Sequence, residues 1–345
     1  MTTTGGCPYN VLVYKIHSLA FLISELYTFH MESVKIKDLT VGDNVTAYYS
    51  VRRREIREYS KGKFVSLELG DATGRIQAVV WEPDNFCLTE LDTSMVVKVK
   101  GSIGEYQGRK QMIVSLIRLA KDDEYALEDI LMHSPQSPEQ RKSRILKLTE
   151  KVENTYIKQL LESFWNDEEF FEKFLTAAAG KLWHHAYIGG LSEHSANVAE
   201  LTLRVAQGYD FLNNDYLISG GLLHDVGKVD TYAVKTSIDY TDQGRLVGHI
   251  CIADTWIYER AHKIETFPES LLTKLRHLIL SHQGEFETPV QPMMPEAFII
   301  YFCDEIDSKM AALDRIRTKV ELPGWSDYVK LLERFLYFDA TEDKK

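Results

Sequence analysis

The chain has 345 residues, of which 44% are hydrophobic and 26% charged, and its net charge is −11. This length accommodates two domains, each with its own core, and the composition is that of an ordinary globular protein. Its four cysteines, Cys7, Cys87, Cys251 and Cys303, form no CxxC pair. This spacing indicates neither a disulfide framework nor a thiolate zinc knuckle, and it favours a reducing, cytoplasmic setting.

The negative charge is unevenly distributed. Residues 31–120 hold 14 Lys and Arg against 12 Asp and Glu, and residues 1–30 are balanced, so the remaining 225 residues carry a net charge of −13. A strongly acidic protein is a poor general binder of nucleic acid, but a near-neutral front half joined to an acidic back half indicates two different roles. The acidic half suits a domain that holds metal ions.

Residues 1–30 contain an apolar run that is interrupted by Lys15, His17 and Glu25. With no basic segment before it and no small-residue cleavage site after it, the run fits neither a signal peptide nor a membrane span. Met31 opens a sequence typical of a natural start. We expect residues 1–30 to be a start-codon artefact or a disordered extension, with a packing helix as the next alternative and membrane attachment as the last.

Residues 31–120 have the pattern of a small β-barrel. Alternating apolar residues at 65–69 and at 76–80 flank the turn at residues 71–74, which predicts a hairpin. Further strands are expected at residues 96–99 and 111–116. About five strands in this length match an OB barrel, a fold that commonly binds single strands.

Aromatic and cationic residues are interleaved along the predicted barrel. Bases stack on aromatic rings and cations follow phosphates, so the mixture favours a groove for single-stranded nucleic acid. Any single aromatic is better explained by packing in a sheet, and only the set favours binding. The residues predicted to bind are Arg52, Arg53, Arg54, Tyr59, Lys63, Trp81, Tyr106 and Arg109.

Residues 121–143 are polar and contain two prolines, which predicts a linker between domains. Residues 144–345 have helical periodicity, so the second domain is expected to be an all-α bundle. The fold class predicted for the chain is therefore an N-terminal all-β OB barrel followed by a helical domain.

Several histidines and carboxylates fall on the apolar faces of the predicted helices. His194 lies on the stripe of Leu191 and Val198, while His224 and Asp225 end one apolar segment and His282 another. Asp304 follows the seven uncharged residues AFIIYFC. A lone inward histidine is usually a hydrogen-bonded core residue, but several buried ionisable groups together are costly unless they share a cation. A His/Asp set without thiolates suits Mn, Fe, Zn or Mg, with Mn favoured over Mg by the imidazoles.

The order of these residues resembles the HD-domain metal-dependent phosphohydrolases. Across residues 31–310 the chain is similar to the YhaM-type 3′→5′ exoribonucleases, which join an OB barrel to an HD domain. The motifs that carry the resemblance are HHAYIGGLSEH, GGLLHDVGK, YTDQGRLVGHI, LSHQGEFE, TPVQPMMPEA and DEIDSKM.

The resemblance implies a site with up to two metal ions. His194, His224, Asp225 and Asp304 would ligate the first ion, and His249 and His282 would serve a second, with Asp225 bridging. Gln283 stands where a further histidine often occurs in two-metal HD sites, which predicts a second site that is weak, completed by water, or absent.

Other residues are candidates for contact with the substrate. Lys228 is predicted to hold a phosphate or polarise the reactive water, although it also suits a helix C-terminus. Arg245 is a candidate phosphate clamp. His184 and His185 are candidates for contacting the strand end or acting as acids. The predicted catalytic set is Asp225, Lys228, Arg245 and His185.

These features predict metal-dependent hydrolysis of single-stranded RNA, with single-stranded DNA as an alternative substrate, from the 3′ end to nucleoside 5′-monophosphates. Two alternatives stay open. One is an HD enzyme for small nucleotides, such as a dNTP or a cyclic dinucleotide, with a regulatory barrel. The other is a non-catalytic single-strand-binding protein. No membrane partner is expected, and the oligomeric state is not predicted.

Overall fold

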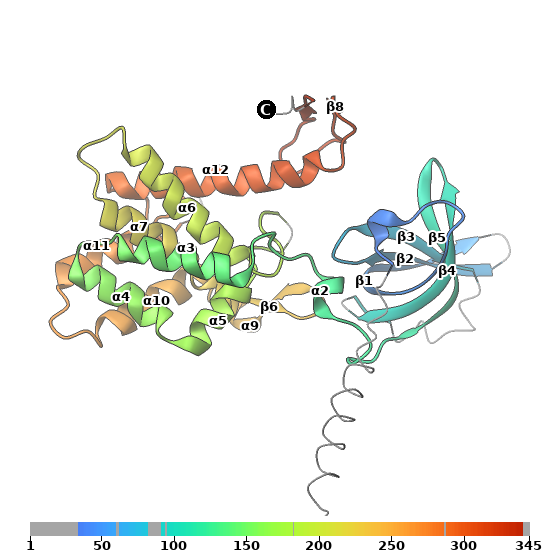
Figure 1. Ribbon diagram of the computed structural model, residues 1–345, viewed down its shortest axis with the longest axis horizontal. Coiled ribbons are helices and arrows are strands. Elements are labelled where there is room, and N and C mark those ends of the chain that lie inside the picture. The colour runs from blue at the N-terminus through green and yellow to red at the C-terminus, as the bar shows by residue number, and fades with distance from the viewer. Residues whose placement is uncertain are drawn as a thin grey trace, which may run out of the picture. The chain divides into compact units, whose positions relative to one another are not determined.

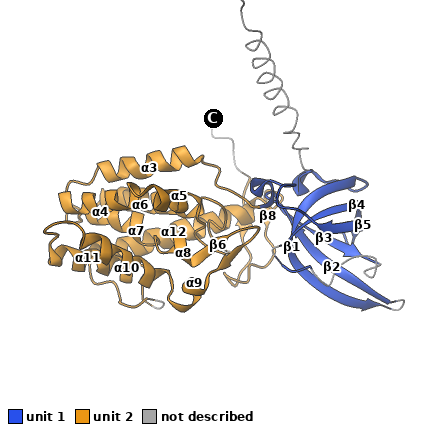
Figure 2. Ribbon diagram, turned by 90° about the horizontal axis from the view of Figure 1, so that it is seen from below, with its two compact units in different colours: residues 1–130 blue, residues 131–345 orange. Residues whose placement is uncertain are grey.

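A computed structural model describes residues 34–59, 62–81, 91–93, 95–181, 183–285 and 288–340. The chain divides into two compact units, residues 1–130 and 131–345 (Figure 2). The expectation about residues 1–30 lies outside the described residues. Within those described, no helix has the length and apolar character needed to cross a membrane.

The first unit is a closed five-stranded barrel with the strand order β1-β2-β3-β5-β4 (Figure 1). All neighbouring strands are antiparallel except β3 and β5, which are parallel. The barrel predicted from the period-two pattern is therefore confirmed. The strands are β1 (Asn44–Tyr59), β2 (Gly62–Gly70), β3 (Arg75–Val80), β4 (Val96–Tyr106) and β5 (Arg109–Leu119), and the short helices are η1 (Ile36–Asp38) and α2 (Leu127–Ile130).

Alternation along the strands produces the barrel core. Val65, Leu67 and Leu69 of β2 point inward, and each is at most 2% exposed. The turn between β2 and β3 is fixed by the Asp71 carboxylate, which accepts hydrogen bonds from the backbone N–H groups of Thr73 and Gly74. Asp71 also accepts one from the N–H of Ile36, so the same carboxylate ties η1 to the barrel.

The second unit is mostly helical, as predicted, and also contains two short two-stranded sheets that helical periodicity did not indicate. Its first long helix begins at Pro138, inside the predicted linker. The helices are α3 (Pro138–Glu150), α4 (Thr155–Trp165), α5 (Glu168–Thr176), α6 (Gly190–Ala206), α7 (Asn214–Leu223), α8 (Lys228–Thr231), α9 (Asp242–Leu246), α10 (His249–Ala261), α11 (Glu269–Leu280) and α12 (Pro295–Arg317). The strands are β6 (Tyr232–Val234), β7 (Ile238–Tyr240), β8 (Gly324–Trp325) and β9 (Tyr337–Phe338).

Side-chain caps set where several of these helices begin. Ser137 and Gln140 form a capping box at the start of α3. The side chains of Asn154, Asp167 and Asn213 accept hydrogen bonds from the first turns of α4, α5 and α7. These caps define the helix starts, and the buried apolar faces of the helices then form one continuous core.

Two glycines allow the close approaches that build the site. A Cβ on Gly221 of α7 would lie 2.6 Å from the Cα of Ala199, so α6 and α7 pack backbone to backbone there. A Cβ on Gly227 would lie 2.8 Å from the backbone nitrogen of Ala253 in α10. The first contact brings α6 against the end of α7, and the second brings the turn after α7 against the start of α10.

Candidate metal centre

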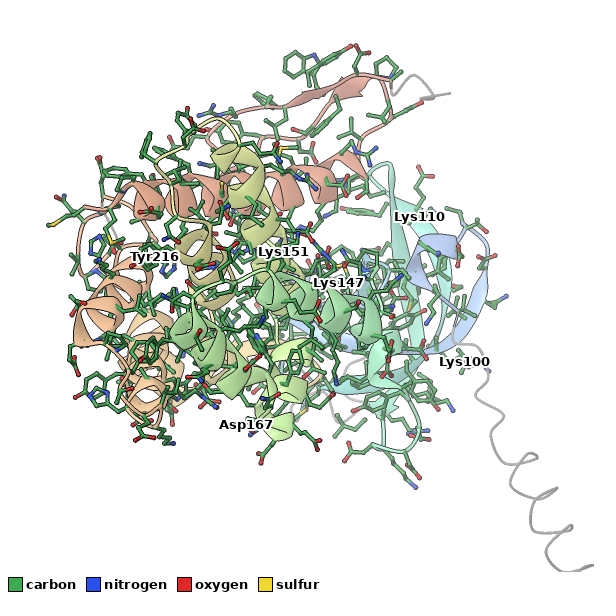
Figure 3. All side chains as sticks on the ribbon, turned by 60° about the vertical axis from the view of Figure 1, so that its left-hand side comes forward. Lys100, Lys110, Lys147, Lys151, Asp167 and Tyr216 are labelled. Carbon is green, nitrogen blue, oxygen red and sulfur yellow. The ribbon has the colours of Figure 1, made fainter. Side chains whose placement is uncertain are left out.

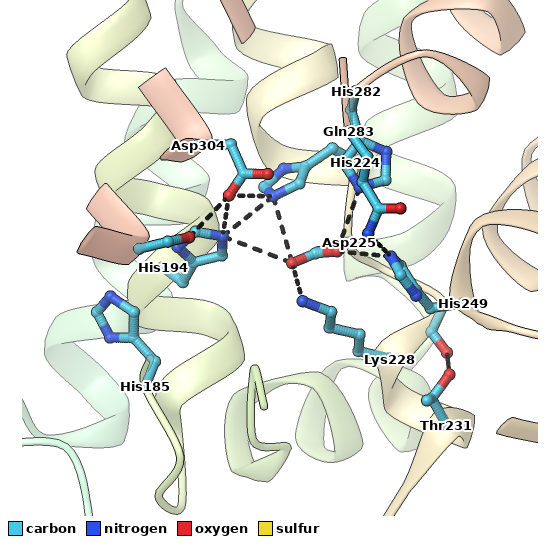
Figure 4. Close-up of polar contacts among 12 residues, drawn as sticks. His185, His194, His224, Asp225, Lys228, Thr231, His249, His282, Gln283 and Asp304 are labelled. Carbon is cyan, nitrogen blue, oxygen red and sulfur yellow. Dashed lines mark hydrogen bonds and ion pairs between the residues drawn. The ribbon is translucent and has the colours of Figure 1, made fainter. Parts of the chain in front are cut away.

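Six of the predicted residues converge inside the helical unit, from five different helices or the turns that follow them (Figure 4). His194 lies on α6 and Asp304 on α12, while His249 is the first residue of α10. His224 and Asp225 follow the end of α7, and His282 follows the end of α11, whereas the apolar spacing had placed them within helices. The last carbonyls of a helix have no partner among the N–H groups of that helix, so they remain available as hydrogen-bond acceptors for these side chains.

The donor atoms of the first group lie close together. His194 Nε2 is 3.1 Å from His224 Nε2 and 3.1 Å from Asp304 Oδ1. Asp225 Oδ2 lies 3.5 Å from His194 Nε2 and 3.4 Å from His224 Nε2. Donors that bind one ion at about 2.1 Å are themselves separated by roughly 3.0 to 3.5 Å. The spacing of this group therefore fits a single divalent ion.

The second oxygen of Asp225 faces a second group. Asp225 Oδ1 lies 3.4 Å from His249 Nε2 and 3.6 Å from His282 Nε2. Among the described residues this buried oxygen has no hydrogen-bond partner. A buried carboxylate oxygen without a donor is costly, and a cation between Asp225, His249 and His282 would satisfy it. Asp225 is thus oriented with one oxygen toward each group.

Gln283 also faces the second group. Its side-chain amide nitrogen lies 3.3 Å from His249 Nε2 (Figure 4). The amide oxygen and nitrogen exchange places by a rotation of the side chain, so either can point at the site. The residue that departs from the two-metal pattern is therefore in position to influence the second ion.

Burial and neighbouring positive charge shift the pKa values of the two carboxylates in opposite directions. Burial would raise the pKa of Asp225, but the Lys228 ammonium and the neighbouring histidines hold it well below its usual value. Burial would likewise raise the pKa of Asp304, and the hydrogen bond from His194 outweighs it. Both carboxylates are therefore kept in the ionised form that a cation requires.

Burial lowers the pKa of His249 to about 3, and the nearby Asp225 charge opposes this only in part. Burial would also lower the pKa of His194, but hydrogen bonds to Asp225, Asp304 and Asp307 raise it well above its ordinary value. His249 is thus a neutral imidazole already suited to bind a metal. His194 must release a proton when it binds one.

The predicted catalytic residues around this centre have different surroundings. Lys228 Nζ lies 2.6 Å from Asp225 Oδ2, so its ammonium belongs to the cluster. His185 is buried, and its two ring nitrogens are 2.7 Å from the Tyr187 hydroxyl and 2.8 Å from Asp307 Oδ2. The Arg245 side chain is 60% exposed, and its guanidinium lies 3.3 Å from Asp239 Oδ1 and over the Tyr240 ring, so these contacts are outside the cluster.

His184 stands at the edge of the centre. Its ring centroid is 5.1 Å from that of His194, and its buried Nδ1 has no hydrogen-bond partner among the described residues. Burial, with a further contribution from Lys228, lowers its pKa to about 2, so the ring is neutral. The sequence had paired His184 with His185, but only His184 has a nitrogen left to contact a ligand.

The predicted nucleic-acid residues of the barrel divide into two sets. Tyr59 and Trp81 meet Phe64 in one aromatic cluster, with ring centroids 5.0–6.0 Å apart, and Trp81 is 46% exposed. Tyr106 and Arg109 pair across the exposed β4–β5 hairpin. In contrast, guanidinium groups of Arg52 and Arg54 donate to backbone carbonyls of the same unit.

The other two predicted cations, Arg53 and Lys63, are exposed. Arg53 pairs with Glu55, and Lys63 lies 3.2 Å from Glu58. Lys100 of β4 is a further exposed cation that the prediction did not name, and Lys110 of β5, which is also exposed, donates a hydrogen bond to the backbone carbonyl of Leu39 (Figure 3).

The sequence-based prediction did not include several residues that surround the candidate metal centre. Asp307 accepts hydrogen bonds from side chains around His194, and Asn197 and Tyr187 contribute to the same network. Asp307 lies in the motif DEIDSKM and Tyr187 in HHAYIGGLSEH, but no role was predicted for either. Spacing is a further signal, since Asp307 follows Asp304 by three residues and Asn197 follows His194 by three, which places each pair on one helix face.

Comparisons with known proteins agree with both units. Residues 50–120 match the OB-fold nucleic acid binding domain family, and residues 191–309 match the HD domain family. The 3′-5′ exoribonuclease YhaM of Bacillus velezensis is 30% identical over 305 residues, which cover 87% of this chain and 96% of the relative. The chain belongs to the YhaM family of 3′-5′ exoribonucleases.

A second YhaM, from a Geobacillus species, is 32% identical over 86% of this chain and 92% of its own length. Among solved structures, an OB-fold domain of replication protein A from Methanococcus maripaludis matches 26% of the chain with 22% identity and a TM-score of 0.22. Family membership, the HD-domain match and the two His/Asp groups together support a divalent-metal site in this protein.

Proposed function

We propose that the protein is a divalent-metal-dependent 3′→5′ exoribonuclease that acts on single-stranded RNA. The observation that carries this proposal is the convergence of four imidazoles and two carboxylates on a buried centre, with Asp225 directed at both halves. Burying this many ionisable groups costs free energy, which bound cations would offset and apolar packing would not. The relatives from Bacillus velezensis and Geobacillus are both named as 3′-5′ exoribonucleases.

The donor set determines which ions fit. His194, His224, Asp225 and Asp304 would hold the first ion, and Asp225, His249 and His282 the second. Imidazoles disfavour Mg²⁺ and the carboxylates favour a hard cation, so Mn²⁺ fits this mixture best, with Fe²⁺, Zn²⁺ and Mg²⁺ as alternatives. When bound, such an ion acts as a Lewis acid on the scissile phosphate and activates water for attack.

The surrounding residues provide contacts for the substrate. The Lys228 ammonium already lies within the cluster, where it can pair with the scissile phosphate. The neutral ring of His184, with its unpartnered Nδ1, is placed to contact the end of the strand. We propose these two for substrate contact, whereas Arg245 would have to leave Asp239 to act as a phosphate clamp.

The barrel would supply most of the affinity for the strand. The Tyr59, Phe64 and Trp81 cluster offers ring faces on which bases of any sequence can stack. The Tyr106 and Arg109 pair and the exposed lysines add aromatic and cationic contacts. We propose that the protein acts in the cytoplasm, releases nucleoside 5′-monophosphates, and accepts single-stranded DNA as a second substrate.

A 5′-labelled single-stranded RNA incubated with the protein in Mn²⁺, Mg²⁺ or EDTA tests the proposal. We expect a ladder that shortens from the 3′ end, release of 5′-monophosphates, and no cleavage in EDTA. Turnover of free dNTPs or cyclic dinucleotides without shortening of the RNA would instead support a small-nucleotide hydrolase. Strand binding without any cleavage would support a non-catalytic single-strand-binding protein.

A further inference from the structure

Three of the histidines at the metal centre are oriented through their Nδ1 atoms, in two different ways. His224 and His282 each direct Nδ1 at the carbonyl oxygen three residues earlier, at 2.9 and 2.7 Å, where their helices end. His194 lies inside α6, where the carbonyls are engaged by the helix itself. Its Nδ1 lies instead 2.7 Å from Asp307 Oδ2, on α12. His194 thus depends on a side chain from another helix for its orientation.

The Asp307 carboxylate is itself held from several sides. Its Oδ2 also lies 2.8 Å from His185 Nε2, and its Oδ1 accepts a hydrogen bond from Asn197 Nδ2 at 3.0 Å. The side chain of Asp307 is 15% exposed, and His194 is fully buried. Three donors from two other parts of the chain leave this carboxylate little freedom to rotate.

His185 is held in an unusual backbone conformation to make its contact. Its φ is 42°, in the left-handed region that residues other than glycine rarely adopt. Its other ring nitrogen lies 2.7 Å from the Tyr187 hydroxyl, which in turn donates to Glu193. With both nitrogens engaged and the ring buried, His185 has no free atom for the substrate and acts on the structure around Asp307.

A metal ion shared by His185, His194 and Asp307 is the alternative explanation of this group, since their ligand atoms lie within 4.8 Å of one another. Asp307 Oδ2 lies 2.7 Å from His194 Nδ1 and 2.8 Å from His185 Nε2, and these are the distances of hydrogen bonds to a charged acceptor. They are shorter than the roughly 3.0 to 3.5 Å expected between donors around one ion. His194 would also have to bind two ions at once, through both nitrogens, and so lose both ring protons.

We propose that Asp307 is a positioning residue for His194. By accepting a hydrogen bond from Nδ1–H, Asp307 fixes the tautomer whose Nε2 is free for the metal, and it makes that nitrogen a stronger ligand. His185 and Asn197 keep the Asp307 carboxylate in place. This inference rests on the proposed metal site and adds to it a residue that binds no metal itself.

Metal titration of the full-length Asp307→Asn variant tests the inference, with Mn²⁺ as the probe. Asparagine keeps the shape of the side chain but removes its charge. We expect the Kd for Mn²⁺ to rise about 10- to 100-fold, with the number of ions per chain unchanged. The visible spectrum of the Co²⁺-loaded protein should also change. Asp314→Asn is the matched control, because Asp314 lies on α12 but pairs with Arg317 at the surface.

The results separate the possible failures. A Kd within twofold of the wild type with an unchanged Co²⁺ spectrum would overturn the positioning role, and loss of one ion per chain would show Asp307 to be a ligand. If the wild type itself binds no divalent ion, the proposed function fails and the inference with it. If Asp307→Asn does not fold, Asn197→Ala and His185→Ala each remove one hydrogen bond to Asp307, and each should weaken Mn²⁺ binding several-fold; wild-type affinity in both would overturn the proposal.

Discussion

The barrel and the helical unit present their candidate functional residues in opposite ways. In the helical unit the six candidate metal ligands have side chains that are at most 18% exposed, and they come from five separate helices or helix ends. Each has a ligand atom 3.1–3.6 Å from that of a neighbour. In the barrel the candidate residues are mostly exposed and spread over several strands. Two of the three consecutive arginines, Arg52 and Arg54, donate hydrogen bonds to backbone carbonyls. Burial makes polar groups costly, so a buried polar cluster identifies a site much more sharply than an exposed set of rings and cations.

The largest expected effect comes from the residue that joins the two halves of the metal centre. Asp225→Asn should lower the rate of RNA hydrolysis about 10³-fold or more, because it removes the charge of the carboxylate that faces both groups. Binding of a single strand should change little, since the barrel is intact. The measurement is hydrolysis and binding of one labelled RNA, with the exposed Asp210→Asn as control. Near wild-type hydrolysis would show that the centre is not catalytic.

The aromatic cluster provides the corresponding test of the barrel. Trp81→Ala should weaken binding of a long single strand by about 2 kcal/mol, or about 30-fold, because a base loses its stacking partner. Cleavage of a dinucleotide should be almost unchanged. Fluorescence anisotropy measures the affinity, and Trp325→Ala, in the helical unit and 67% exposed, is the control. Equal affinities for wild type and Trp81→Ala would exclude the cluster from the binding surface.

Gln283→His sharpens the comparison within the metal centre. An imidazole binds these ions better than an amide, so the variant should lower the Mn²⁺ concentration needed for half-maximal activity about 10-fold. Calorimetric titration should show a tighter second site, whereas Gln207→His, an exposed substitution at the end of α6, should not. Unchanged stoichiometry and unchanged Mn²⁺ dependence would mean that residue 283 does not complete a second site.

The smallest expected effect concerns the arginine run. Arg53→Ala should weaken strand binding only a few-fold and reduce the slope of log affinity against log salt by about 0.7, the value for one phosphate contact on a single strand. Arg53 is the exposed member of the run, with a side chain that is 70% exposed. Arg204→Ala, on α6, is the control. A slope identical to the wild type would place the phosphates elsewhere on the barrel.

Much of this protein follows from local pattern. Alternation along residues 65–69 and 76–80 predicted the β2–β3 hairpin, because a strand directs every second side chain to one face. Helical spacing placed His194 and Asp304 on buried faces, and the order of the His and Asp motifs identified the HD domain. The two short sheets of the helical unit were not predicted, since strands of two or three residues are too short to show a period.

The sequence alone determined which residue types the centre contains and in what order they occur, because those motifs are contiguous or lie at helical spacing. Only the tertiary structure decided how they act together. The two orientations of the Asp225 oxygens follow from the close packing of α6, α7 and α10 at Gly221 and Gly227, and the contact of Asp307 with His194 follows from the packing of α12 against α6. The free nitrogen of His184 likewise has no counterpart in local spacing. Contacts between residues that are tens to more than a hundred positions apart leave no periodic signal along the chain, since they are set by packing and not by local spacing.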